Sequence, residues 1–140
     1  MSASRLPWAV AVLAILVMSV PHVAGAASEY GGASATEYVL LPKFCWGQYA
    51  DGLKGPEYNI PSGCGVGMNH YCYGLLDLQR SKKAKNAGER RLLLTHAQDH
   101  TRYTIRWMKQ EGTTATCSIG PHVEATMREI ELKFKIYGIK

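Results

Sequence analysis

The sequence lacks an apolar run long enough to cross a membrane. Its longest uncharged apolar stretch, Trp8–Val20, has thirteen residues, whereas a membrane-spanning helix needs about 20. The stretch follows Arg5 and precedes the small residues Ala24-Gly25-Ala26, which is typical of a cleavable secretory signal peptide. No cysteine lies directly after it, so there is no lipid attachment point. We therefore predict a signal peptide at residues 1–26, no stable membrane anchor, and a periplasmic or secreted protein.

The sequence also lacks the alternation of apolar and polar residues that a β-sheet needs, because no stretch keeps a period of two for long enough. Removing 26 of the 140 residues leaves 114, which is enough for one compact domain. Residues 27–36 are small, rich in glycine and nearly uncharged, which is typical of a flexible leader. We predict an all-α fold, a small helical-hairpin domain of about four helices, over residues 37–140.

No strong excess of charge of one sign is present. The formal net charge is +5, and basic residues cluster only at Arg80–Lys85 and Arg90-Arg91. Both clusters fall at predicted helix ends, and cations are favourable at a helix C-terminus. Nucleic-acid binding needs a basic face with interleaved aromatic residues. We therefore expect no nucleic-acid partner.

Catalytic and cofactor-binding motifs are missing as well. The chain has no Cys-x-x-Cys-His motif for covalent haem and no nucleophile elbow. Ser118, His122 and Glu124 have the side chains of a nucleophile, a base and an orienting carboxylate, but they lie too close along one helical turn to converge as a triad. We expect neither an enzyme nor a bound cofactor.

Helical periodicity is what the sequence does contain. The predicted elements are a short helix that begins at Lys43 after Pro42 and ends at Asp51-Gly52, a loop at 54–67, a helix from Met68 to about Gly88, a helix at 89–111 and a helix from about Pro121. The clearest apolar stripe is in the last helix and comprises Val123, Met127, Ile130, Phe134 and Tyr137. The stripe of the helix at 89–111 comprises Leu93, Ala97, His100, Thr104, Trp107 and Met108.

Three pairs of opposite charges, each four residues apart, support the last helix. They are Glu124/Arg128, Glu129/Lys133 and Glu131/Lys135. Each such pair contributes about 0.2–0.5 kcal/mol to a helix.

Four cysteines follow the signal segment: Cys45, Cys64, Cys72 and Cys117. An even number in a small exported domain predicts two disulfides. The helices beginning at Met68 and near Glu89 are joined by a short link and should be antiparallel. Cys64 and Cys117 then meet at one end of this hairpin, which leaves Cys45 to pair with Cys72.

Three histidines are candidates for a metal site or a buried polar site. Cys64, His70 and Cys72 do not have the spacing of a zinc site, and export favours disulfides over metal-binding thiolates. His70 is therefore predicted to be half-buried at a helix start and hydrogen-bonded through one ring nitrogen. His96 and His100 share one helical face beside Asp99, but two ligands do not make a site, and they are only weak metal candidates.

Four segments carry a resemblance to a known group of proteins. The stretches "FCWGQYADG", "CGVGMNHYCYGLL", "HTRYTIRWM" and "CSIGPHVEATMREIELK" resemble bacterial exported proteins related to tetratricopeptide repeat proteins. The resemblance covers about residues 42–140. It implies helical-hairpin packing, in which Gly74 and Ala97 are the close-packing residues of two helices. It also implies that protein or peptide binding is the commonest use of such a domain.

Two functional hypotheses follow. The first is an exported helical scaffold, stapled by disulfides, that binds a protein or peptide partner in the cell envelope. The alternative is a metal-handling or redox protein that uses His96 and His100. The identity of a partner is not encoded in any motif of the sequence.

Overall fold

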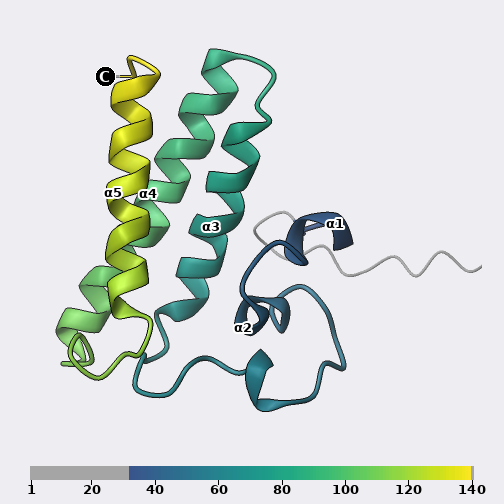
Figure 1. The fold of residues 1–140 in the computed structure, drawn as a ribbon, viewed down its shortest axis with the longest axis vertical. Coiled ribbons are helices and arrows are strands. Elements are labelled where there is room, and N and C mark those ends of the chain that lie inside the picture. Colours follow the sequence, from purple (N-terminus) through teal and green to yellow (C-terminus); the bar gives the residue numbers. More distant parts are fainter. Residues whose placement is uncertain (1–31, 140) are drawn as a thin grey trace, which may run out of the picture.

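The computed structural model describes residues 32–139, so the predicted signal peptide and residues 27–31 of the predicted leader lie outside the described residues. The elements in chain order are α1 (Ala35–Tyr38), α2 (Lys43–Trp46), the 3-10 helix η1 (Pro56–Tyr58), α3 (Met68–Lys82), α4 (Ala87–Gln110) and α5 (Gly120–Ile136) (Figure 1). No strand occurs among these residues. The all-α prediction is therefore confirmed.

The long helices α3 and α4 form an antiparallel hairpin, and they approach each other closely at Gly74 (Figure 1). A Cβ atom on Gly74 would lie 2.8 Å from Oγ1 of Thr101 and 3.2 Å from the carbonyl oxygen of Ala97. Thr101 is fully buried, and its hydroxyl donates to the same Ala97 carbonyl at 2.7 Å. Helices pack this closely only where one of them presents a very small residue.

The link between α3 and α4 differs in detail from the prediction. Helix α3 ends at Lys82 rather than near Gly88, and Gly88 lies in the first turn of α4. The reason is the cap of α4, since Asn86 Oδ1 accepts a hydrogen bond from the backbone N–H of Glu89 at 2.8 Å. The Glu89 carboxylate accepts in turn from the backbone N–H of Lys85 at 2.7 Å. Asn is a preferred helix N-cap, so α4 begins at Ala87 and Gly88 falls within its first turn.

Helix α5 packs mainly on α4. Val123 and Ile130 are fully buried, and the hydroxyl groups of Tyr71 and Thr126 share a hydrogen bond of 2.9 Å that joins α3 to α5. The predicted stripe is correct as far as Phe134, which is half-buried, but Tyr137 is 41% exposed because the helix ends at Ile136.

Two of the three predicted charge pairs of α5 are present. Glu124 and Arg128 lie 3.9 Å apart, and Glu129 and Lys133 lie 3.6 Å apart. The third pair is not among the ion pairs of residues 32–139.

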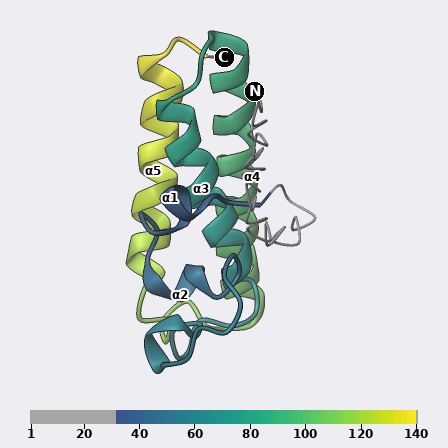
Figure 2. The same ribbon diagram turned by 90° about the vertical axis from the view of Figure 1, so that its right-hand side faces the viewer.

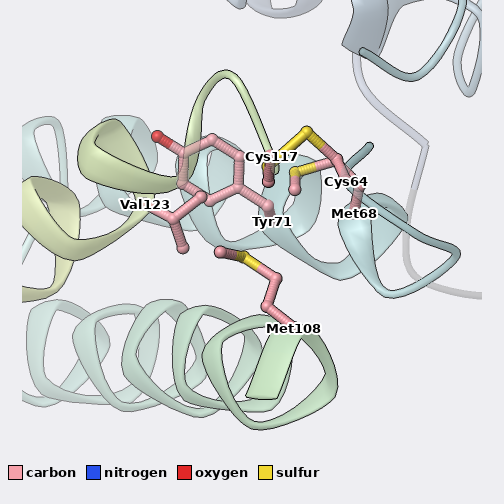
Figure 3. Packing of buried hydrophobic residues seen from close by; sticks show 6 residues of the cluster. All are labelled: Cys64, Met68, Tyr71, Met108, Cys117 and Val123. Carbon is pink, nitrogen blue, oxygen red and sulfur yellow. A yellow bond between two sulfur atoms is a disulfide. The ribbon is translucent and has the colours of Figure 1, made fainter. Parts of the chain in front are cut away.

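The two disulfides join the pairs that the hairpin layout predicts, Cys45–Cys72 and Cys64–Cys117. Figure 3 shows Tyr71 between Val123 and the Cys64–Cys117 disulfide, with Met108 of α4 pointing toward this cluster. The second bond, Cys45–Cys72, fixes α2 to α3. Each cross-link of this length contributes about 2–4 kcal/mol by restricting the unfolded chain.

The N-terminal segment lies beside α3, on the side away from α5 (Figures 1 and 2). The predicted first helix is much shorter than expected, since α2 ends at Trp46 and not at Asp51-Gly52. Helix α1 begins at Ala35, two residues inside the predicted leader. It is held by Glu37, whose carboxylate accepts from the backbone N–H of Ser34 at 2.9 Å and from Nε of Arg80 at 2.8 Å.

Candidate functional site

An apolar groove of about 430 Å³ runs along α3, between α5 and the segment that joins α1 to α2. In Figure 1, α3 lies between these two walls. The lining residues are Leu40, Leu41, Pro42 and Phe44 from the N-terminal segment, Tyr71, Leu75, Leu78, Gln79 and Lys82 from α3, and Ile119, His122 and Glu129 from the α5 region.

The floor of the groove is one face of α3. Tyr71, Leu75, Leu78 and Lys82 follow steps of four, three and four, and therefore lie in one row along the helix. Tyr71 and Leu78 are only 4% and 3% exposed, because they lie in clusters with Val123 and Ile130 of α5. Leu75 is half-buried and is the apolar residue of this row that is most open to the groove.

The N-terminal wall is held in place by two independent links. One is the Cys45–Cys72 disulfide. The other is the ion pair between Glu37 and Arg80, whose side chains are both about three-quarters buried. The hydrogen bond from Arg80 lowers the pKa of Glu37 to about 2, although partial burial acts in the opposite direction. The wall is therefore fixed before any ligand binds, which reduces the entropy that binding would cost.

Polar groups lie at the rim of the groove. Nζ of Lys82 is 3.6 Å from a carboxylate oxygen of Glu129, and this pair spans the groove from α3 to α5. The side-chain amide of Gln79 donates to the carbonyl oxygen of Leu40 at 3.2 Å. The side chain of Leu40 itself is 62% exposed at the edge. An apolar floor with a polar rim is the arrangement found in protein interfaces.

A second cluster lies where α3 and α4 meet, at His70 and His100. Their Nδ1 atoms are 3.0 Å apart, and the ring of Tyr103 lies against His70 with a centroid separation of 3.9 Å. Tyr73 also contacts both histidine rings. The prediction for His70 is confirmed, because the residue is half-buried and bonded through one ring nitrogen. Its partner, His100, was not predicted from the spacing along either helix.

Burial lowers the pKa of both His70 and His100. For His100 the nearby His70 and His96 add to this effect, whereas Asp99 opposes it. On the same side of α3, burial raises the pKa of Asp77, and His96 and Arg80 oppose that shift. This cluster therefore favours neutral imidazole rings.

The structure does not assemble the predicted metal candidates into a site. His96 is exposed, while His100 is bonded to His70 on the neighbouring helix. Within residues 32–139, no three His, Cys, Asp or Glu side chains are grouped so that they could hold a metal ion.

The three residues considered for a catalytic triad have separate surroundings in the structure. His122 lines the groove, and Glu124 pairs with Arg128. Ser118, His122 and Glu124 are all exposed.

Sequence reasoning missed most of the groove. The residues Leu40, Leu41 and Phe44 were assigned no role, although the apolar pair before Pro42 is a usable signal for a buried segment. Among the residues that the structure describes, no helix combines the length and the apolar character that a bilayer span needs.

Comparison with known proteins gives no relative. No protein-family model, curated protein or solved structure matches this chain significantly. The resemblance to exported proteins related to tetratricopeptide repeat proteins stays a prediction.

Proposed function

We propose that the protein is an exported helical scaffold that binds a protein or peptide partner in the cell envelope. The observation that supports this proposal is the apolar groove along α3, between α5 and the N-terminal segment. Its floor carries Tyr71, Leu75 and Leu78. Grooves of this kind bind the apolar face of an amphipathic segment, whose side chains reach the floor at helical spacing.

The preformed walls support the same proposal. The Cys45–Cys72 disulfide and the Glu37–Arg80 ion pair hold the N-terminal wall against α3. Leu40, at the rim, is an exposed apolar residue next to a concave apolar surface. Contiguous exposed apolar surface with a polar rim is a mark of interaction sites rather than of ordinary protein surface.

The export part of the proposal rests on the signal-like sequence of residues 1–26 and on the disulfides. Two disulfides in a small domain fit an oxidising compartment outside the cytoplasm. The resemblance to exported proteins related to tetratricopeptide repeat proteins supports the same location and the same use. Periplasmic or secreted location and partner binding are thus proposed together.

No structural observation supports the metal or redox alternative as strongly as the groove supports partner binding. It was based on His96 and His100, and His100 is bonded to His70 instead. We propose no second function.

Site-specific photo-crosslinking in the exporting cell tests the binding role. A photoreactive amino acid at Leu40 should give a discrete adduct with a protein or peptide. The matched control is the same probe at Leu92, which is 56% exposed, compared with 62% for Leu40, but lies away from the groove. Equal yields from both positions, or no adduct from position 40, would contradict the proposal.

A further inference from the structure

The net charge of the described chain is concentrated in one short segment. Residues 32–139 contain 14 Lys and Arg and 10 Asp and Glu, a net charge of +4. Residues 81–92, which end α3, form the link and begin α4, contain five Lys and Arg and one Glu, which is also a net charge of +4. The rest of the described chain is therefore neutral as a whole, and the excess of positive charge belongs to the α3–α4 link and its flanks.

The end of α5 lies beside this basic segment. Cζ of Arg90 is 4.8 Å from the centre of the Tyr137 ring, and Nζ of Lys82 is 3.6 Å from a carboxylate oxygen of Glu129. In Figure 1 the α3–α4 link and the end of α5 lie at the same end of the helices. Ile136 and Tyr137 are 66% and 41% exposed there. Exposed apolar side chains and the excess of positive charge thus occur together.

The helix dipole and internal contacts account for only part of this basic segment. Lys82 lies in the last turn of α3, where a cation is favourable. Arg90 lies in the first turn of α4, where the dipole disfavours a cation, but it donates to the carbonyl oxygens of Ser81 and Ala84 at 3.3 and 3.2 Å and so closes the link. Lys85 lies outside both helices and is exposed, so neither reason applies to it.

The exposed lysines of the link suit a diffuse anionic surface. Within residues 32–139, Lys83 and Lys85 belong to no ion pair. Lysine carries a compact hydrated charge, whereas the planar fork of arginine is better matched to a single carboxylate in a fixed geometry. Lysines next to an exposed tyrosine and an aliphatic residue are also typical of segments that lie at a membrane–water interface.

We infer that this end of the molecule binds reversibly to a membrane surface rich in anionic lipids. Lys83 and Lys85 contact the lipid headgroups, and Ile136 and Tyr137 enter the boundary between the headgroups and the acyl chains. None of these four residues lines the groove. The contact therefore adds to the proposed partner binding and does not depend on it.

Leu92 lies outside this contact. It is two residues before the fully buried Leu94, which packs in one cluster with Ile130 of α5, and it is hence on the opposite side of α4. Because Ile136 and Tyr137 belong to the α5 side, Leu92 is turned away from the membrane.

Co-sedimentation of the exported, disulfide-bonded protein with lipid vesicles tests the inference. The protein should bind vesicles that contain about 30% phosphatidylglycerol, and it should bind pure phosphatidylcholine vesicles at least about tenfold more weakly. Raising the salt concentration to about 0.5 M should release most of the bound protein, because surface charges are then screened over a few ångströms. Equal binding to both kinds of vesicle would overturn the inference, and so would binding to neither.

Charge reversal tests which end of the molecule binds. The double variant Lys83→Glu/Lys85→Glu should lower the partition coefficient by more than about tenfold, since each basic group near an anionic surface changes binding by roughly fivefold. The matched control is Lys43→Glu/Lys54→Glu, which makes the same change in net charge at two exposed lysines outside residues 81–92 and should bind nearly as the unsubstituted protein does. Equal losses in both variants would overturn the assignment to this end. Circular dichroism and a free-thiol assay check that each variant keeps its helices and both disulfides.

A serine substitution tests the apolar part of the contact. Ile136→Ser should weaken binding to the anionic vesicles severalfold. Val66→Ser, at a position before α3 that is 64% exposed, should leave binding unchanged. Equal binding of these two variants would overturn the insertion of the α5 end.

A photoreactive amino acid at Lys85 in the exporting cell distinguishes a membrane from an acidic protein as the occupant. Adducts with lipid support the inference, whereas a discrete protein adduct would overturn it. The probe at Leu40 reports on the groove separately, so failure of the membrane contact can be told apart from failure of the proposed function.

Discussion

The Nδ1 atoms of His70 and His100 lie 3.0 Å apart and connect the first turn of α3 to α4. One ring nitrogen must carry a proton and donate it, while the other presents its lone pair. The ring centroids are 5.2 Å apart, and the ring planes are tilted by 40°. If both rings were charged, both Nδ1 atoms would carry a hydrogen, so no acceptor would remain and two positive charges would be in contact.

This relationship predicts a specific dependence of stability on pH. Because the pKa values of His70 and His100 are lowered in the folded state, the unfolded chain binds more protons below the usual histidine pKa, near 6.5. The stabilisation is therefore complete above about pH 6.5 and falls as the pH decreases toward the lowered values. Denaturant unfolding between pH 7.5 and 5 should show a decreasing free energy of unfolding.

Substitution of His100 tests whether the His70–His100 pair causes this pH dependence. His100→Gln should reduce the slope of unfolding free energy against pH over this range, because one of the two lowered groups is removed. His96 is not a suitable control, because its charge contributes to the lowered pKa of His100. Equal slopes in the His100 variant and the unsubstituted protein would show that the pair does not titrate as described.

The close contact of α3 and α4 predicts opposite effects for two glycine substitutions. Gly74→Ala places a methyl group 2.8 Å from Oγ1 of the buried Thr101, and overpacking of this kind typically costs about 1–3 kcal/mol. Gly88→Ala, in the exposed first turn of α4, should be neutral or stabilise by up to about 1 kcal/mol. Thermal unfolding of both variants is the measurement, and a Gly74→Ala variant as stable as Gly88→Ala would contradict the packing described.

The core contacts of α5 predict that alanine substitutions along its apolar stripe destabilise the protein by unequal amounts. Ile130 is fully buried, so Ile130→Ala should lower the free energy of unfolding by about 2–5 kcal/mol. Phe134 is only half-buried, and Phe134→Ala should therefore cost less than the roughly 3–5 kcal/mol typical of a buried phenylalanine. Denaturant unfolding should rank the two variants in this order. The reverse order would mean that the end of α5 is buried by a contact absent from the single chain.

Much of the fold could be predicted because local signals and the disulfide pattern agree. Helices α3, α4 and α5 carry apolar periodicity and clear end signals, and their antiparallel order is sufficient to pair Cys64 with Cys117. The prediction of the apolar stripe of α4 was less accurate than that of α5. Its fully buried residues include Leu94 and Thr101, whereas the predicted His100 and Trp107 are half-buried. A helix that packs on two neighbours has a wider buried face than one stripe describes.

The remaining features depend on contacts between distant residues. Helix α1 has four residues and depends on the bond from Glu37 to Arg80, 43 residues later in the chain. The His70–His100 pair requires the hairpin register, which the Cys64–Cys117 pairing could have supplied. The groove lies between α5 and the segment that joins α1 to α2, and periodicity alone does not determine where these two walls are placed on α3.

Radical footprinting of the protein in the cell envelope tests the central claim most directly, namely that the groove is covered by a partner. Leu40 and Leu92 have similar exposure, 62% and 56%, in the single chain. Labelling of Leu40 relative to Leu92 should fall severalfold in the envelope compared with dilute purified protein, since only Leu40 borders the groove. An unchanged ratio would contradict the claim, because it would mean that the groove stays open to water where the protein works.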